Sequence, residues 1–235
     1  MPPETTDHFE AIWRRKLATG GPVGYRPGEN RRVDKALRLL RQGERMLDVG
    51  CGAGSLATQA HERFREVHGV DLSPTAVALA RASGVQARVL DLSREPLPHP
   101  DGFFDAVTAL GVLPYVWDLD RLLGECVRVL RAGGQMLVGV PNMRALWRLW
   151  SVAARGRFPR TSQDPVGYDG GSMHYFCRRD LAALLERHRL VVVAAHGVFC
   201  IPRRLEAFPD EGVGGWVKRE LFSAELVVDA RKLPA

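Results

Sequence analysis

An apolar strand pattern that runs directly into a glycine turn is the feature that most constrains this chain. Residues 46–49 have the pattern of a buried strand, Gly50, Gly52 and Gly54 follow at alternate positions, and a helical pattern begins at Ser55. Glycine permits a tight turn and a close approach of a ligand to the backbone, and the start of the next helix offers free N–H groups. This combination is typical of nucleotide sites in doubly wound α/β sheets.

Two acidic residues on neighbouring strands strengthen the nucleotide interpretation. Asp71 ends the next predicted strand, 17 residues past Gly54, and Asp91 ends the third one. A carboxylate at the end of the second strand can accept hydrogen bonds from both ribose hydroxyls of an adenosine. Because the carboxyl ends of parallel strands meet at one edge of a sheet, the sequence predicts an adenosine pocket there.

Asp48 distinguishes between two cofactors that fit this loop. Residues 52–57 also satisfy G-x-G-x-x-[GA], so the spacing alone allows a nicotinamide dinucleotide. A carboxylate just before the loop repels a pyrophosphate in a partly dry cleft, whereas it attracts the cationic amino group of S-adenosylmethionine. The residues therefore favour S-adenosylmethionine, with an NAD(P)-dependent oxidoreductase as the less favoured alternative.

The alternation of strand-length apolar runs with helical patterns predicts the fold class. It is typical of an α/β protein with a doubly wound, mostly parallel sheet. Strands are predicted over residues 45–49, 66–70, 86–90, 105–110, 135–140, 190–196 and 224–228. Helices are predicted over residues 7–16, 29–40, 55–64, 74–82, 119–130 and 180–188, the fifth of them closed by Gly133 and Gly134. We expect a seven-stranded Rossmann-like sheet.

We expect one domain over residues 1–235, with two segments that cover the open edge of the sheet. These are an N-terminal helical arm, residues 1–42, and an insertion after the fifth strand, residues 143–176, around a core of residues 43–142 and a C-terminal part of the sheet, residues 177–235. In the insertion, an amphipathic pattern over residues 145–154 predicts that Leu146, Leu149 and Trp150 turn inward. The arginines of this pattern then form an exposed face. Candidates for lining the acceptor pocket are Tyr25, Tyr115 and Tyr168. Five arginines lie in or near the insertion, namely Arg144, Arg148, Arg155, Arg157 and Arg160.

Composition narrows the classes of partner and location. The apolar runs are far shorter than the roughly 20 residues that a membrane span needs, and the polar start does not resemble a secretory signal. Hence we expect a cytoplasmic protein without a membrane span. The four cysteines form no C-x-x-C pair, so no metal site is predicted. The net charge is +6, but the arginines are spread along the chain, so we do not expect a nucleic-acid partner.

Six short stretches together resemble the class I S-adenosylmethionine-dependent methyltransferases. The resemblance is closest to the small-molecule type 11/12 group, which includes the ubiquinone-biosynthesis enzymes. It is strong over about residues 43–142 and continues weakly through His174-Tyr175-Phe176. The stretches that carry it are residues 47–56, 69–73, 90–92, 97–107, 128–134 and 140–142.

For the methionine end of the cofactor, the resemblance implies a set of residues at the first strand. Asp48 and the backbone of Gly50 hold the amino-acid part. Gly52 and Gly54 give it room. This agrees with the electrostatic interpretation of Asp48 above.

For the adenosine end, the resemblance implies residues at the ends of the next three strands. Asp71 takes the ribose and Leu72 packs on the adenine. Asp91 with Leu92 meets the adenine edge, and Leu110 lies under the cofactor. The implied activity is methyl transfer to a small-molecule acceptor.

The acceptor chemistry points to a general base. Methyl transfer from a sulfonium is an in-line displacement, so alignment of the acceptor supplies much of the rate. A hydroxyl or ammonium acceptor must also lose a proton, and His is matched to neutral pH. We expect His174 to be this base, because it lies in the insertion after the fifth strand. Pro114 and Tyr115 stand where the group commonly carries His or Glu-His, which leaves open a non-catalytic regulatory or partner-binding protein.

Overall fold

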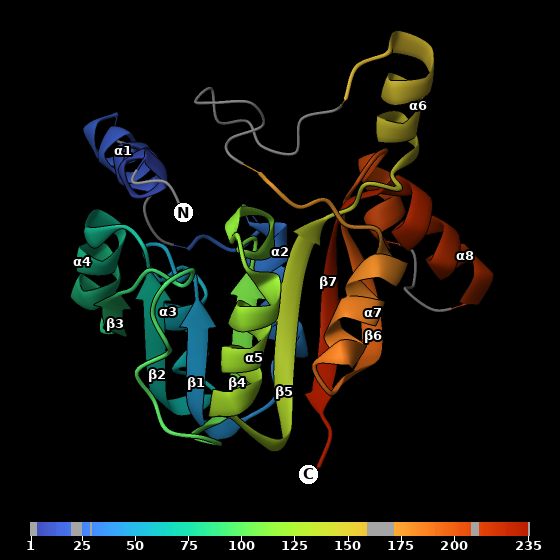
Figure 1. Ribbon diagram of the computed structural model, residues 1–235. Coiled ribbons are helices and arrows are strands. Elements are labelled where there is room, and N and C mark those ends of the chain that lie inside the picture. The colour runs from blue at the N-terminus through green and yellow to red at the C-terminus, as the bar shows by residue number, and fades with distance from the viewer. Residues whose placement is uncertain (1–3, 20–24, 29, 159–171, 208–211, 235) are drawn as a thin grey trace.

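The computed structural model contains a seven-stranded sheet with helices on both faces (Figure 1). It describes residues 4–19, 25–28, 30–158, 172–207 and 212–234. The strand order is β3-β2-β1-β4-β5-β7-β6. The strands are β1 (Gly43–Val49), β2 (Phe64–Asp71), β3 (Gln86–Val89), β4 (Phe104–Leu110), β5 (Leu130–Pro141), β6 (Leu190–Cys200) and β7 (Ser223–Lys232). The predicted fold class is confirmed.

The sheet is mixed, because β7 lies between β5 and β6 and is antiparallel to both. Pairing along β1, β2, β3, β4 and β5 is parallel. From β1 the chain moves outward in one direction to β2 and β3, and then returns to β4 on the other side. This reversal between β1 and β4 opens a crevice at the carboxyl ends of the strands, which is where doubly wound sheets bind ligands.

Two hydrophobic clusters hold the helices on opposite faces of the sheet. One includes apolar side chains of α5 and α7, and the other includes those of α2, α3 and α4. The helices are α1 (Glu4–Ala18), α2 (Arg31–Leu39), α3 (Ala57–Ala60), α4 (Pro74–Ala82), α5 (Leu119–Val129), α6 (Leu146–Arg155), α7 (Arg178–Arg187) and α8 (Gly212–Val217). Short 3-10 turns lie at Leu113–Tyr115 and Arg203–Ala207, and a π-helix at Lys218–Phe222. None of the helices among the described residues is both long and apolar enough to cross a membrane.

The helix predicted over residues 55–64 is wrong in length. Only Ala57–Ala60 are α-helical, and β2 already begins at Phe64. Phe64 is buried and pairs with Gly43 at the start of β1, so the chain has to leave the helix early to reach that register. Tertiary pairing here overrides a helical pattern in the sequence.

The prediction that Gly133 and Gly134 close the fifth helix is also wrong. The helix ends at Val129, and Leu130 already belongs to β5. The register between β4 and β5 shifts just after Leu130, and Gly133 adopts φ +69° there. The glycine pair therefore accommodates a bulge inside a strand, for which a positive φ without a Cβ is needed.

Helix α6 buries the face that its sequence pattern predicts to be exposed, so that prediction is wrong. Leu146, Leu149 and Trp150 are 43%, 46% and 54% exposed, whereas Arg148 is only 4% exposed. The Arg148 guanidinium donates hydrogen bonds to the carbonyl oxygens of Asn142 at 2.6 Å and Ala224 at 2.7 Å. These two carbonyls lie where β5 ends and β7 begins, so the arginine face is held against the body and the apolar face is turned outward.

Candidate active site

Two adjoining cavities occupy the crevice at the carboxyl ends of β1 and β4. Their volumes are about 200 and 520 Å³, and Trp13, Gly50 and Gly52 line both. The smaller cavity extends toward β2 and β3 and the larger toward α2. The glycine turn therefore lies between them, as expected for a ligand that spans the turn.

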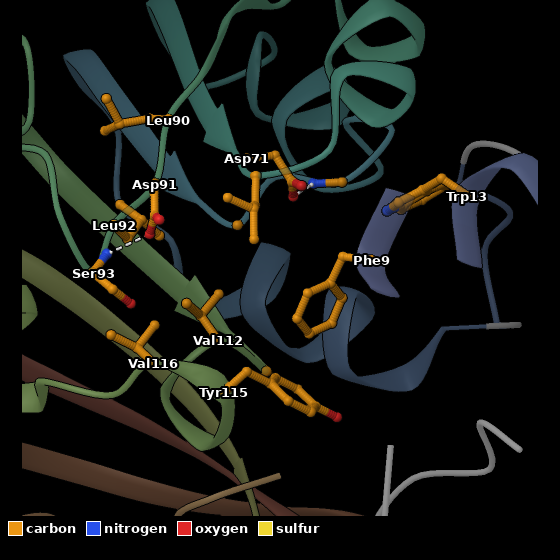
Figure 2. Close-up of a pocket in the computed structure, with 14 residues that line it drawn as sticks. Phe9, Trp13, Asp71, Leu90, Asp91, Leu92, Ser93, Val112, Tyr115 and Val116 are labelled. Atoms are coloured by element: carbon orange, nitrogen blue, oxygen red, sulfur yellow. Dashed lines mark hydrogen bonds between the residues drawn. The ribbon is translucent and has the colours of Figure 1, made fainter. Parts of the chain in front are cut away.

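Asp71 projects from the end of β2 into the smaller cavity (Figure 2). One carboxylate oxygen accepts the Gly52 N–H at 2.8 Å and the other accepts the Ser73 N–H at 3.0 Å. Each oxygen retains a further lone pair for a ligand hydroxyl. Burial raises the pKa of Asp71, while the backbone N–H groups of Ser73, Gly52 and Leu72 hold it down. The carboxylate is thus fixed in orientation and keeps two acceptors for a pair of hydroxyls.

The rest of the smaller cavity is an apolar slot with one more carboxyl group. Leu72, Leu92 and Val116 contribute apolar walls. Asp91, after β3, also lines the slot, and its carboxylate accepts the Ser93 N–H at 2.9 Å. Apolar walls with an acceptor at the rim suit a planar base that has an exocyclic amino group.

Asp48 lines the larger cavity and is nearly inaccessible to solvent, at 4% exposure. Burial raises its pKa to about 7, with a smaller contribution from the charge of Asp71, while the Thr108 hydroxyl donates to it at 2.6 Å and opposes the rise. A buried carboxylate of this kind is stabilised by a cationic ligand in the adjoining cavity. Leu110, at the end of β4, lines the same cavity.

Three basic residues also line the larger cavity, namely Lys16, Arg26 and Arg32. An Nη atom of Arg32 lies 3.4 Å from a carboxylate oxygen of Glu225 on β7. The sequence analysis missed these cations, because they come from the arm and no motif marks them. A cavity that holds both Asp48 and several cations can bind both charges of a zwitterion.

The three glycines of the turn have different roles. A Cβ at Gly50 would stand 2.2 Å from Val112 Cγ2, and one at Gly52 would stand 2.7 Å from Trp13 Cζ2. Gly54 lines neither cavity, and a Cβ there would face Val85 at 3.2 Å. Gly50 and Gly52 therefore border the ligand space, while Gly54 permits close packing of the turn beneath it.

Helix α1 covers the cavities with two aromatic side chains that the sequence analysis missed. Phe9 and Trp13 line the smaller cavity, and Phe9 packs edge-to-face on Tyr115 with ring centroids 5.3 Å apart (Figure 2). Lys16 lies over the Trp13 ring, 4.4 Å from its centroid. The i, i+4 spacing of Phe9 and Trp13 on one helix face was the available signal.

Glu10 fastens α1 to the start of α4. Its carboxylate accepts hydrogen bonds from the Ser73 hydroxyl at 2.6 Å and the Thr75 N–H at 3.1 Å, and from the Thr75 hydroxyl. Burial by itself would raise the pKa of Glu10, but these donors outweigh it and lower the pKa to about 2. The carboxylate is thus held at the N-terminus of a helix, where negative charge is stabilised.

The structure does not bring His174 to either cavity. Its Nε2 lies 2.9 Å from the carbonyl oxygen of Val116, to which it can only donate. Tyr115 does line the smaller cavity, while the Tyr25 hydroxyl donates to Asp34 instead. Tyr168 and Arg160 lie outside the described residues. Among the described residues, no group of three or more His, Cys, Asp or Glu side chains is placed to hold a metal ion.

Known proteins are similar to this chain over the glycine turn and the strands around it. Residues 47–138 match a family model described as a methyltransferase domain. A demethylmenaquinone methyltransferase of Thermus thermophilus is 40% identical over 134 residues, which are 54% of this chain and 58% of that protein. A ubiquinone biosynthesis O-methyltransferase of Xanthomonas oryzae is 34% identical over 58% of this chain and 60% of its own length. This chain therefore spans less than two thirds of the length of these relatives.

A solved structure extends the likeness beyond the glycine turn. The S-adenosylmethionine-dependent methyltransferase of Mesorhizobium loti superposes with a TM-score of 0.63 at 26% identity. The match covers 86% of this chain and 98% of that one. It therefore includes most of the sheet.

Proposed function

This chain belongs to the class I S-adenosylmethionine-dependent methyltransferases of the type 11 group, and we propose that it transfers a methyl group from S-adenosylmethionine to a small-molecule acceptor. The observation that carries this proposal is the pair of carboxylates on either side of the glycine turn. Asp71 faces the smaller cavity with two free acceptor positions, and Asp48 faces the larger one as a buried carboxyl. These positions suit the ribose and the ammonium group of one extended ligand.

The residues present fit this cofactor in both cavities. In the smaller one, Asp71 would hold the ribose, and Leu72 and Leu92 would pack on the adenine. The Asp91 carboxylate would accept a hydrogen bond from the adenine amino group. The absence of a Cβ at Gly52 allows the Trp13 ring to lie close to the turn.

In the larger cavity, Asp48 and the Gly50 backbone would hold the methionine ammonium, with Leu110 as an apolar wall. Arg32 and Lys16 line the same space, where a ligand carboxylate would stabilise their charge. Gly54 would support the turn from below. When bound, the cofactor supplies an electrophilic methyl group on a sulfonium.

The residues of this chain would orient the acceptor and exclude water from the site. Phe9, Trp13 and Tyr115 surround the smaller cavity with aromatic surface, which limits water near a bound ligand. Holding the acceptor in line with the methyl group removes much of the entropic barrier. We keep His174 as a proposed base, tested by His174→Gln: a loss of turnover with unchanged cofactor affinity supports the role, and unchanged turnover contradicts it.

The acceptor is proposed to be a small molecule because of the relatives that the chain resembles. Two of them are named for demethylmenaquinone and for ubiquinone biosynthesis. Incubation of the protein with methyl-labelled cofactor and a cell extract should yield a labelled small molecule. A stable complex with another protein and no labelled product would instead support a non-catalytic partner protein.

Calorimetry of cofactor binding tests the site itself. Asp71→Ala should weaken binding of S-adenosylmethionine by about 1.5–3 kcal/mol, the usual value for a hydrogen bond to a charged group. Asp120→Ala is the matched control, because this carboxylate is exposed on α5. Equal affinity in the Asp71 variant, or stronger thermal stabilisation by NADH than by S-adenosylmethionine, would contradict the proposed site.

A further inference from the structure

Helix α6 presents an apolar face for which the described part of the chain provides no cover. Leu146, Leu149, Trp150 and Ala153 follow the i, i+3, i+4, i+7 pattern, which places them on one side of the helix. All four side chains are exposed to solvent. We call these four residues the α6 face. In a helix that packs on its own domain, such a face points to the core, whereas here the described residues leave it exposed to solvent.

The orientation of α6 is fixed by its polar side. Arg148 is buried and donates to two carbonyl oxygens at the end of β5 and the start of β7. Its guanidinium also lies over the Trp147 ring, 4.6 Å from the centroid. Turning the α6 face inward would expose these groups and remove the charged donor from both carbonyls. The outward orientation is therefore specified by hydrogen bonds.

The charged side chains of α6 and its flanking residues are all arginines, of which Arg144 is paired with Glu220 at 3.2 Å. Residues 142–158 contain four arginines and no acidic residue. The Arg155 guanidinium lies over the Trp150 ring at 4.4 Å, and that of Arg144 lies over the ring of Trp216 on α8 at 5.4 Å. Val213, on the same short helix α8, is 81% exposed. Tryptophan and leucine flanked by arginine is the composition of helices that lie in the interface of a membrane.

We propose that the α6 face docks on the anionic lipid surface of a membrane. The apolar side chains would enter the boundary between headgroups and acyl chains, while Arg155 and Arg157 would stay at the level of the phosphates. A second copy of the chain is a poorer occupant, because a symmetric contact would bring the same arginines together. In Figure 1, α6 projects beyond the carboxyl edge of the sheet, the edge at which the crevice opens.

Docking in this way would turn the carboxyl edge toward the lipid. Together with the proposed methyl transfer, on which this consequence rests, it would favour acceptors that are carried in or on the membrane. The docking itself rests on α6 alone and requires no cofactor. Its failure and the failure of the proposed activity can therefore be told apart.

Sedimentation with vesicles tests the proposal. The full chain should bind vesicles of phosphatidylcholine with about 30% phosphatidylglycerol, more weakly in high salt, and bind pure phosphatidylcholine poorly. The double variant Leu149→Ser, Trp150→Ser should lower the partition coefficient at least about tenfold. Val193→Ser is the control, because Val193 is 56% exposed on the edge strand β6. It should bind as the wild type does.

Two results would overturn the proposal. One is equal vesicle binding by the wild type and the double variant, or no binding by either. The other is a dimer in sedimentation velocity that the double variant dissolves, which would assign the α6 face to self-association. Circular dichroism and cofactor calorimetry of each variant verify that it is folded.

Discussion

Helices α1 and α6 both lie beyond the carboxyl edge of the sheet, one toward each side, yet they use their side chains in opposite ways (Figure 1). In α1, Phe9 and Trp13 turn toward the cavities and the carboxylate of Glu10 fastens the helix to α4. In α6, the apolar side chains turn outward and Arg148 makes the contact with the body. Amphipathic character alone therefore does not determine which face of a covering helix is buried.

The difference follows from what each helix finds below it. Under α1 lie the apolar walls of a cavity and the aromatic ring of Tyr115, so an aromatic face gains by contact. Under α6 lie the carbonyl oxygens of Asn142 and Ala224, each of which accepts a backbone N–H and the Arg148 guanidinium as well. The loss of these two charge-assisted hydrogen bonds costs more than an exposed leucine.

The largest effect is expected when the Arg148 side chain, which holds α6 on the sheet, is removed. Arg148→Ala should lower the free energy of unfolding by about 3 kcal/mol, because it removes two hydrogen bonds made by a buried charged donor. Arg155→Ala, on the same helix but exposed, should change it by less than about 0.5 kcal/mol. Urea unfolding measures both. Similar values for the two variants would show that the polar face of α6 does not anchor it.

The next test concerns the attachment of α1. Glu10→Ala removes the hydrogen bonds to Ser73 and Thr75, which should weaken the docking of α1 by about 2 kcal/mol. Amide exchange in α1 should then rise on the order of 30-fold, while exchange in α6 stays unchanged. Asp7→Ala, exposed on the same helix, is the control. Equal exchange in α1 for wild type and Glu10 variant would contradict the role of this carboxylate.

The same attachment should depend on acid. The pKa of Glu10 falls from its ordinary 4.5 to about 2. A lowered pKa in the folded state means that the contribution of Glu10 is complete above about pH 4.5 and is lost as the pH falls toward 2. Exchange in α1 should therefore remain slow at pH 5.

A third test exploits the carboxyl group in the cavity that α1 borders. The pKa of Asp48 is raised to about 7, so in the free protein its charge is present above that pH and is lost below it. Binding of a cationic ammonium group requires the charged form, so the affinity for S-adenosylmethionine should fall by about tenfold per pH unit below 7. Asp48→Asn should bind weakly and with a flat profile between pH 5.5 and 8. A flat profile in the wild type would show that Asp48 does not meet a cation.

The smallest effect is expected on the α6 face itself. Leu149→Gln should change the free energy of unfolding by less than about 0.5 kcal/mol, because this side chain is already exposed. Leu181→Ala on α7, a fully buried leucine, should cost about 2–5 kcal/mol. A cost above about 1 kcal/mol for Leu149→Gln would show that the domain itself covers the α6 face.

Much of the fold and the cofactor site was predictable because the signals are local. The strand that ends at Val49 is specified by its own residues, and so is the glycine turn after it. Asp48, Asp71 and Asp91 were predicted to lie at one edge, and they do, because parallel strands align their ends. These features depend on periodicity and on the conformations that glycine allows.

The features that were predicted wrongly, or missed, depend on partners far away in the chain. The early start of β2 follows from its pairing with Gly43, and the place of Gly133 follows from a bulge against β4. Helix α1 was expected as a cover, but its attachment by Glu10 to Ser73 joins residues 63 apart in sequence. No local pattern contains such information.

The sequence by itself therefore determined the doubly wound sheet, the glycine turn and the acidic residues at the strand ends. Only the tertiary structure decided how the two helices beyond the carboxyl edge are used. The physical reason is that a helical periodicity specifies two faces and not which one is buried. That choice depends on whether the surface below offers apolar walls, as beneath Trp13, or carbonyl oxygens that can accept a further hydrogen bond, as beneath Arg148.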